Sequence, residues 1–355
     1  MPAHRIDPQI QARLPSVIAS SERGTAAAPL AHDAPPSWRA VAAGPVVAAV
    51  TLATALIVTG AAGVPLRDPA GVSLRRFVSA AALVALLVAA DIVFRAGRAR
   101  WTRARALAVG SALVSFYVTY LAYRNLKSVV PLLHDETFDG RLADLDRTLF
   151  AGHDPANLLH SLLGGGVSAY TLSSVYELFF VFIPVAIALA LVLLPDLRAG
   201  LFLTTALSIN WALAAGSYFI LPSLGPIYAT PADFAHLPVT GVSGLQDALL
   251  EARTEFLLDP SAGGAVQSIG AFASLHVSIF FTAALATHLL GLGRFVKMGV
   301  WILFALTVIA TIYFGWHYML DDVGGLVIAV AALALARALT GVNPRTARQP
   351  LRAPG

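Results

Sequence analysis

Eight apolar stretches constrain the fold of this chain more than any other feature. A helix needs about 20 apolar residues to cross the hydrocarbon core of a bilayer. The stretches near this length are 40–63, 77–95, 105–123, 167–194, 199–221, 273–292, 298–316 and 318–339. The composition agrees, because 57% of the 355 residues are hydrophobic, only 12% are charged, and the mean hydropathy is +0.73. We therefore expect an all-α polytopic membrane protein with about eight transmembrane helices.

The basic residues predict how these helices are oriented. With eight spans, sixteen of the 24 Lys and Arg residues fall on the side of the two termini and eight on the other side. Because cytoplasmic segments carry the excess of Lys and Arg, both termini are expected in the cytoplasm of a plasma membrane protein. The high pI, near 9.6, then reflects membrane topology and not nucleic acid binding. The chain has no cysteine, which excludes disulfides and thiolate chemistry.

Four segments outside the spans have distinct compositions. Residues 1–37 are rich in Ala, Pro and Ser and predict a disordered cytoplasmic tail, and residues 340–355 predict a short basic tail. Residues 124–166 mix charged and apolar side chains, which favours an amphipathic segment on the membrane surface. Residues 222–272 contain many Gly and Pro, and we expect them to form a lid over the helices.

The first chemically interesting motif begins the sixth span. Ser274 is a good N-cap residue, and a helix N-terminus at the membrane surface favours bound anions. His276 follows within the first turn and would stand beside such a site. A histidine that only caps the helix or anchors it at the interface is the alternative.

The second motif precedes the last span, at His317 and Asp321. If the last helix begins near Trp316, these two side chains share one helical face, one turn apart. The carboxylate could then accept the Nδ1 proton and raise the basicity of Nε2, as a nucleophilic histidine requires. Asp322 would point about 100° away and is the weaker candidate. A purely structural pair at the interface is the alternative.

The spacing of the two motifs favours a shared functional site. They lie on the same side of the membrane, joined by one outbound and one returning helix, so adjacent antiparallel helices would bring them together. One imidazole could then attack phosphorus while the other protonates the departing oxygen. Two histidines and an aspartate could also bind zinc, but no fourth ligand is evident, and we expect neither a metal nor a cofactor.

These motifs resemble a known family. Ser-Leu-His at 274–276 together with Gly-Trp-His-Tyr-x-x-Asp at 315–321 is similar to the type 2 phosphatidic acid phosphatase superfamily. It looks most like the branch that contains the inositol phosphorylceramide synthases. The resemblance implies a six-helix catalytic core at 105–339, preceded by two accessory helices within 38–104.

The resemblance also implies a role for each catalytic residue. His317 would be the nucleophile that forms a phosphohistidine, Asp321 would orient it, and His276 would be the acid for the leaving group. In the outer loop, Gly225-Pro226 before Tyr228 also looks like this branch, so these residues and Ser274 are candidates for substrate binding.

The chain departs from the superfamily pattern in three places. Leu275 stands where glycine is common, Thr311 stands where an arginine is expected, and a first motif of lysine followed by Arg-Pro is absent. The cations that would hold the phosphate are therefore not given by the motifs. Arg124 and Lys127, at the outer end of the third span, are the candidates, with interfacial anchoring as the alternative.

The expected function is the transfer of a phospho-headgroup, such as phosphoinositol, between lipids. The alternative is a phosphatase acting on a lipid phosphate or a polyprenyl (pyro)phosphate, because both reactions share the first step. The partner would be a phospholipid or isoprenoid-phosphate substrate within the bilayer, and the sequence does not identify protein partners. A non-enzymatic transporter would need ionisable residues at mid-bilayer and broken helices in matching halves, which the sequence does not show.

Overall fold

The computed structural model describes residues 36–67, 71–94, 100–262 and 266–343. Most of the predicted disordered N-terminal tail (1–37) and most of the predicted basic C-terminal tail (340–355) lie outside these residues. The part of the chain that the structure describes contains helices and no strand, as the sequence predicts.

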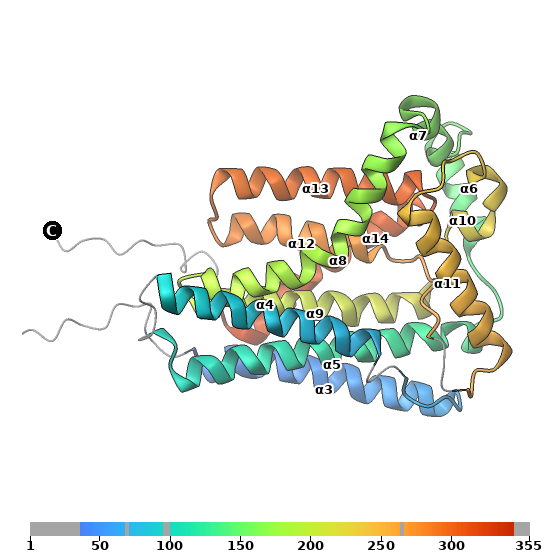
Figure 1. Ribbon diagram of the computed structural model, residues 1–355. Coiled ribbons are helices and arrows are strands. Elements are labelled where there is room, and N and C mark those ends of the chain that lie inside the picture. The colour runs from blue at the N-terminus through green and yellow to red at the C-terminus, as the bar shows by residue number, and fades with distance from the viewer. Residues whose placement is uncertain (1–35, 68–70, 95–99, 263–265, 344–355) are drawn as a thin grey trace, which may run out of the picture. The chain divides into compact units, whose positions relative to one another are not determined.

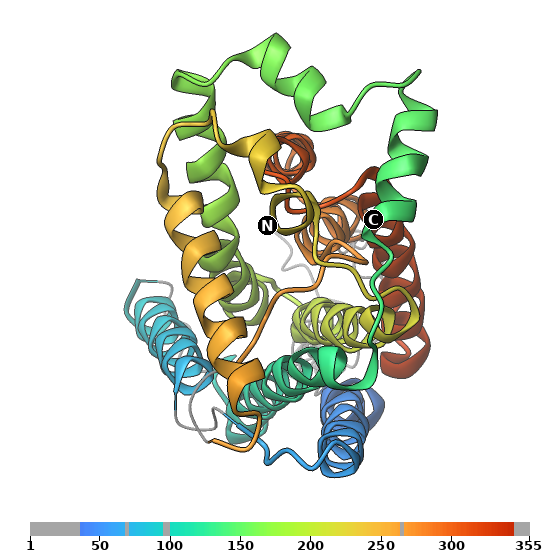
Figure 2. The ribbon, with the colours of Figure 1, turned by 90° about the vertical axis from the view of Figure 1, so that its right-hand side faces the viewer.

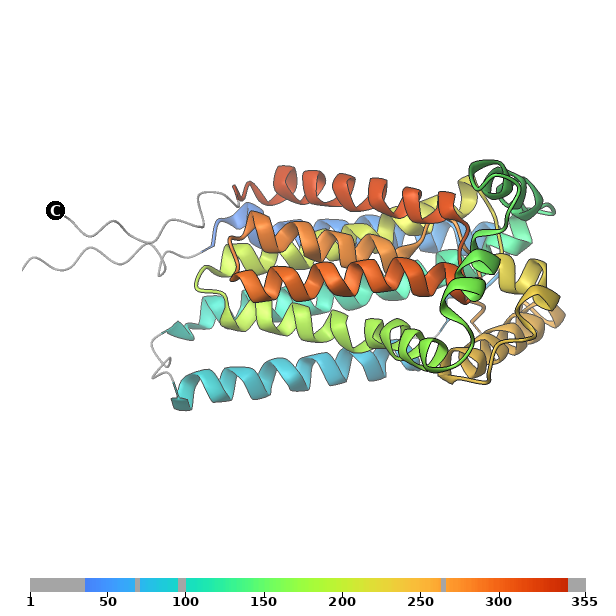
Figure 3. The ribbon, with the colours of Figure 1, turned by 90° about the horizontal axis from the view of Figure 1, so that it is seen from above.

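Seven of the described helices are long and apolar enough to cross a bilayer. They are α3 (Trp38–Ala61), α4 (Val72–Phe94), α5 (Arg103–Leu133), α8 (Val167–Leu193), α9 (Leu197–Ile220), α13 (Arg294–Tyr313) and α14 (Met319–Thr340). The sixth predicted span is a shorter apolar helix, α12 (Leu275–Leu289), of 15 residues. The eight helices run side by side (Figures 1 and 3). The all-helical, polytopic membrane fold is confirmed.

Shorter helices gather at one end of this bundle (Figure 1). They are α6 (Asp139–Leu149), α7 (Pro155–Leu163), α10 (Pro226–Ala229), the 3-10 helix η2 (Pro231–Phe234) and α11 (Gly241–Leu258). All five come from the two loops that the sequence predicts to be long. In Figure 2, which looks onto this end, α10, η2 and α11 lie across the helix ends. The segment 222–272 therefore covers the helices, as expected of a lid.

Helix α5 differs most from its predicted bounds. The apolar stretch ends at residue 123, but the helix continues to Leu133. The polar residues Arg124, Asn125 and Lys127 do not interrupt it, because they turn inward while Val129 and Val130 continue the packed face. Arg124 and Lys127 therefore project from a long helix and not from the start of a loop.

The connection between α13 and α14 is a short turn. Helix α14 starts at Met319, one residue after the start of the predicted span 318–339, but later than the start near Trp316 on which the pairing of His317 and Asp321 along one helix depended. Gly315 adopts a positive φ of 67°, and the Trp316 N–H donates to the Thr311 carbonyl at 2.9 Å. His317 consequently lies in the turn before the helix.

Helices α12 and α14 touch through backbone at their starts. The Ser274 N–H donates to the Asp321 carbonyl at 2.9 Å. Gly325 makes this approach possible, since a Cβ atom there would lie 2.5 Å from the Ser274 carbonyl oxygen. Small residues allow such backbone contact between membrane helices.

We predict that Gly325→Ala destabilises the protein by roughly 1–3 kcal/mol, because the added methyl group meets rigid backbone. Gly299→Ala on α13 is the matched control, since a Cβ there has no neighbour within 4 Å. Alanine is favoured over glycine within a helix, so the control should be neutral or slightly stabilised. Thermal unfolding of the three purified proteins in one detergent measures the difference. Equal midpoints for the two variants would contradict the close approach.

Candidate active site

A cavity of about 300 Å³ lies under the lid, at the end of the bundle where the short helices gather. Its walls come from α4, α5, α8, α9, α11 and α12, together with the turn before α14. The ionisable, tyrosine and tryptophan side chains that line it are Arg76, Tyr120, Tyr123, Arg124, Lys127, Tyr176, Trp211, Tyr218, Tyr228, His276, Trp316 and His317. The structure therefore brings both predicted histidines and both predicted cations to one cavity.

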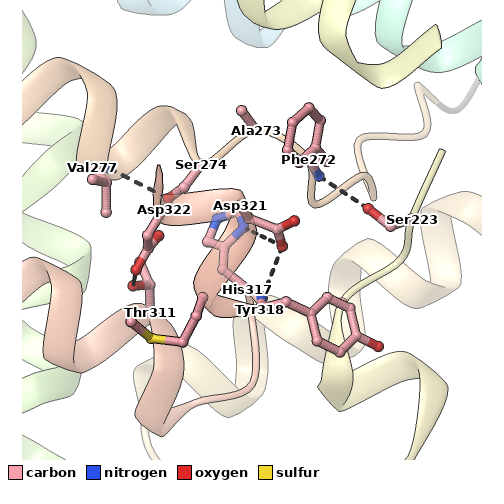
Figure 4. Close-up of polar contacts among 12 residues, drawn as sticks. Ser223, Phe272, Ala273, Ser274, Val277, Thr311, His317, Tyr318, Asp321 and Asp322 are labelled. Atoms are coloured by element: carbon pink, nitrogen blue, oxygen red, sulfur yellow. Dashed lines mark hydrogen bonds and ion pairs between the residues drawn. The ribbon is translucent and has the colours of Figure 1, made fainter. Parts of the chain in front are cut away.

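His317 is held by the aspartate that the sequence predicts. Its Nδ1 lies 3.4 Å from Oδ2 of Asp321, which is fully buried. The same oxygen accepts the Tyr318 N–H at 2.8 Å, which fixes the carboxylate at the start of α14 (Figure 4). At 3.4 Å the contact is longer than a good hydrogen bond, and it becomes an ion pair only when the imidazole is protonated. It can strengthen when the imidazole becomes positive.

Burial lowers the pKa of His317 from 6.5 to about 4. The negative charge of Asp322 opposes this shift, while Lys127 adds to it. The imidazole is therefore neutral at pH 7, which leaves a ring nitrogen with a free lone pair. A nucleophilic histidine needs this protonation state.

Asp322 is buried next to Asp321 in the first turn of α14, and its negative charge acts on His317. It is 4% exposed, and it accepts a hydrogen bond from the Thr311 hydroxyl at 3.2 Å (Figure 4). The Ser274 hydroxyl also bonds to it. The sequence argument assumed one helix containing His317, Asp321 and Asp322. This assumption was wrong, because α14 begins at Met319 and His317 precedes it.

His276 lies in the first turn of α12, where Ser274 is the N-cap as predicted and accepts the Val277 N–H at 3.5 Å. Its ring stacks on Phe179 and Tyr176 of α8, at centroid distances of 3.8 and 4.2 Å. Its Nε2 is buried and has no hydrogen-bond partner among the described residues. The ring is thus held by aromatic contacts, while one nitrogen is available for a proton transfer.

Three cations line the cavity. Arg124 and Lys127 lie one turn apart on α5, and Arg76 comes from α4. Arg124 donates to the Ser73 hydroxyl at 3.2 Å, and Lys127 donates to the Tyr218 hydroxyl at 3.3 Å. No Asp or Glu of the described residues lines the cavity. Its net positive lining suits an anion such as a phosphate ester.

Sequence reasoning missed Arg76 as a candidate. Arg75 and Arg76 are two of the eight basic residues on the side away from the termini, and they entered only the prediction of membrane orientation. They precede an apolar span that lies outside the implied catalytic core. The position of Arg76 at the end of an apolar span, like that of Arg124, was the signal that could have identified it.

The other predicted binding residues fall in two groups. Tyr228 lines the cavity, and its hydroxyl donates to the Gln246 carbonyl at 3.2 Å. Gly225, Pro226 and Ser274 are not among the lining residues. Gly225 has a φ of 99°, and a Cβ there would lie 2.4 Å from the Trp316 carbonyl. It packs against the turn that carries His317, and a role in substrate binding stays a prediction for all three.

Two aspartates of α6 support the same turn, and no sequence motif indicates them. Asp139 accepts the Gly225 N–H at 2.9 Å and the Tyr318 hydroxyl at 3.1 Å. Asp146 accepts the Met319 N–H at 3.1 Å, and burial raises the pKa of this carboxyl to about 6. These hydrogen bonds connect α6 to the lid and to the start of α14.

Comparison with known proteins agrees with this geometry. Residues 140–335, more than half of the chain, match the family described as the PAP2 superfamily. The chain belongs to the PAP2 superfamily. Membership marks it as a phosphatase- or phosphotransferase-type lipid enzyme of the membrane, and the superfamily resemblance of the two motifs is confirmed. No curated protein and no solved structure matches the chain significantly.

The match covers only part of the bundle. It includes α8, α9, α12, α13 and most of α14, with both histidines, while α3, α4 and α5 precede it. Arg76, Arg124 and Lys127 therefore stand on helices outside the matched segment of this PAP2 protein.

We predict that Arg76→Ala, Arg124→Ala and Lys127→Ala each weaken binding of orthovanadate by about tenfold or more. A hydrogen bond to a charged group contributes roughly 1.5–3 kcal/mol, which corresponds to this factor. Tryptophan fluorescence can report binding, because Trp211 and Trp316 line the cavity. Arg198→Ala is the control, since Arg198 pairs with Asp196 at 2.9 Å on an exposed site elsewhere. Unchanged affinity in all three cavity variants would move the anion site elsewhere.

Proposed function

We propose that this PAP2 protein is a lipid phosphotransferase that acts through a phosphohistidine on His317. The observation that carries the proposal is the position of this imidazole. It is buried and neutral, with a carboxylate at Nδ1 and three cations lining the same cavity. This arrangement suits attack on phosphorus, since it supplies a lone pair and fixed positive charge for the phosphoryl oxygens.

In the first step, Nε2 of His317 forms a bond to phosphorus, and the bond from phosphorus to the lipid oxygen breaks. His276 gives its proton to that oxygen, so the lipid leaves as an alcohol. Asp321 stabilises the positive charge that develops on the phosphorylated imidazole. In the second step, the hydroxyl of an acceptor attacks phosphorus, His276 takes its proton, and His317 leaves as a neutral imidazole. The cations of α4 and α5 stabilise the charge on the transferring group in both steps.

Transfer of a phospho-headgroup, such as phosphoinositol, to a second lipid is the reaction that the motif resemblance favours. A second pocket, of about 230 Å³, adjoins the catalytic cavity and shares Lys127, Tyr218 and Gly270 with it. It offers an acceptor a route separate from that of the donor. The alternative acceptor is water, which would make the protein a phosphatase of lipid phosphates or polyprenyl (pyro)phosphates. Purified protein with labelled phosphatidylinositol, with and without an acceptor lipid, separates the two reactions.

The proposal includes a topology and a domain division. Residues 38–104 provide two accessory helices, and residues 105–339 form the six-helix catalytic core. Both termini lie in the cytoplasm, and the cavity opens at the outer face of the plasma membrane. The excess of basic residues on the side of the termini supports this orientation.

We predict that the two histidines differ in their response to the leaving group. His317→Ala should abolish formation of a base-stable, acid-labile phospho-enzyme from every donor. His276→Ala should slow its formation from a lipid donor by about 10²–10⁴-fold, the usual contribution of a general acid. The loss should shrink with p-nitrophenyl phosphate, because nitrophenolate departs without a proton. Asp321→Asn should fall between the two, since it keeps the shape of the side chain and removes the charge.

Quantitative trapping of labelled phosphate after rapid mixing measures these rates. Full phosphate incorporation in His317→Ala would refute the assignment of the nucleophile. An equal loss with both donors in His276→Ala would refute its role as the acid.

We also predict that the rate of the first step has an acid limb, the fall in rate on the acid side of its pH profile, at an unusually low pH. Since the pKa of His317 lies near 4, below its ordinary value of 6.5, the nucleophile is neutral at every pH above about 4. Phospho-enzyme formation at low donor concentration should therefore fall only as the pH drops through about 4, and not near 6.5. Asp322→Asn should shift the limb further toward acid, because the Asp322 charge raises this pKa. Rapid mixing with an alkaline quench provides the profile, and a limb at 6.5 would contradict the burial effect.

A further inference from the structure

An apolar cavity, different from the pocket of about 230 Å³ considered for the acceptor, also adjoins the catalytic cavity. It has a volume of about 480 Å³, within the usual range for ligand pockets. Its walls are α4, α5 and α8, with Trp211 of α9. They carry apolar side chains such as Phe77, Leu83, Leu113, Phe116 and Ile187. Its polar lining residues include Ser73, Arg75 and Arg76, which lie near the outer end of α4. The cavity is thus apolar toward the middle of the bundle and basic toward the active site. We call it the α4 groove.

The groove exists because α4 does not pack along its whole length. Of its residues only Ser73, Val84 and Asp91 are buried. Polar contacts hold the two ends: Ser73 accepts from Arg124, and Asp91 accepts from the Trp101 indole N–H at 2.8 Å. Between them, Ser79 and Ala80 present small side chains to the groove. Figures 2 and 3 both show α4 at the edge of the bundle.

The groove and the catalytic cavity meet at four residues that line both: Arg76, Tyr120, Phe180 and Trp211. Arg76 marks the boundary. Its guanidinium donates to the Tyr120 hydroxyl, and its Cζ lies 4.8 Å from the centre of the Phe180 ring. A cation fixed at this point stands between an apolar space and the cavity that contains both histidines.

We propose that the α4 groove binds the hydrocarbon tail of a lipid phosphate ester whose phosphate occupies the catalytic cavity. The inference rests on the proposed function for the identity of the reacting group. A lipid phosphate matches the two cavities in polarity. Its charged head would lie next to Arg76 in the catalytic cavity, and its apolar chain would lie in the groove. The lipid chain exchanges one apolar environment for another when it leaves the bilayer, so the groove acts by aligning the donor with its phosphate beside Arg76. Small phosphate esters have no chain to align in this way. The accessory helix α4 is then part of the substrate site.

A photoreactive lipid tests the groove independently of catalysis. The probe is phosphatidic acid with a diazirine in one acyl chain, applied to the full-length protein in detergent micelles. We expect crosslinks at Leu83, Leu113 and Ile187, and we expect dioleoyl phosphatidic acid to compete for them. Ala80→Trp should reduce them by about tenfold by filling the groove. Ala82→Trp is the matched control, because Ala82 is an exposed α4 residue that does not line the groove. Val185→Trp fills the groove from α8 if the first variant does not fold.

Crosslinks spread equally over exposed lipid-facing residues such as Phe295 and Ile302 would overturn the proposal, as would equal labelling of Ala80→Trp and Ala82→Trp. Turnover gives a second readout. Ala80→Trp should lower kcat/KM for a dioleoyl donor about tenfold and leave p-nitrophenyl phosphate unchanged, and an equal loss for both would also overturn the proposal. If the wild-type protein forms no phospho-enzyme from either donor, the proposed function fails, while the crosslinks still decide whether the groove binds the lipid.

Discussion

The contact between the starts of α12 and α14 determines the geometry on which the rest of the site depends. One backbone hydrogen bond, from Ser274 to Asp321, joins the two helices, and each helix start lies within four residues of one histidine. Water cannot replace a backbone bond where the surroundings are apolar, so breaking it would cost several kcal/mol. The bond therefore fixes the relation between His276 and His317 more firmly than any side-chain contact could.

The charges around His317 are separated in space by sign. Arg76, Arg124 and Lys127 line the cavity, while the Asp321 carboxylate lies at Nδ1 of the ring and Asp322 is buried at the start of α14. Buried charges are costly unless they are paired or hydrogen-bonded, and here the carboxylates are held by N–H and hydroxyl donors. The cavity is thus left with positive side chains beside the imidazole.

The sequence predicted those features that follow from local pattern. The spans were identified because only helices of about 20 apolar residues cross a bilayer, and the histidine motifs were identified by their spacing. It failed where tertiary packing decides the outcome. Helix α5 extends past its apolar stretch because Arg124 and Lys127 face an internal cavity, which periodicity alone cannot show. Asp139 is a loop carboxylate until the fold brings it to Gly225 and Tyr318, which are distant in the sequence.

The lid is connected to the catalytic turn through backbone atoms, and this has a mechanical consequence. The Ile227 N–H donates to the Gly315 carbonyl at 2.8 Å, and Gly225 packs directly against the carbonyl of Trp316. Lifting this part of the lid would therefore pull on the turn that positions His317. If this part of the lid opened at each turnover, it would displace His317 from its catalytic position. This part of the lid is fixed to the turn that carries His317. Substrates and products therefore have to enter and leave between the helices that surround the cavity.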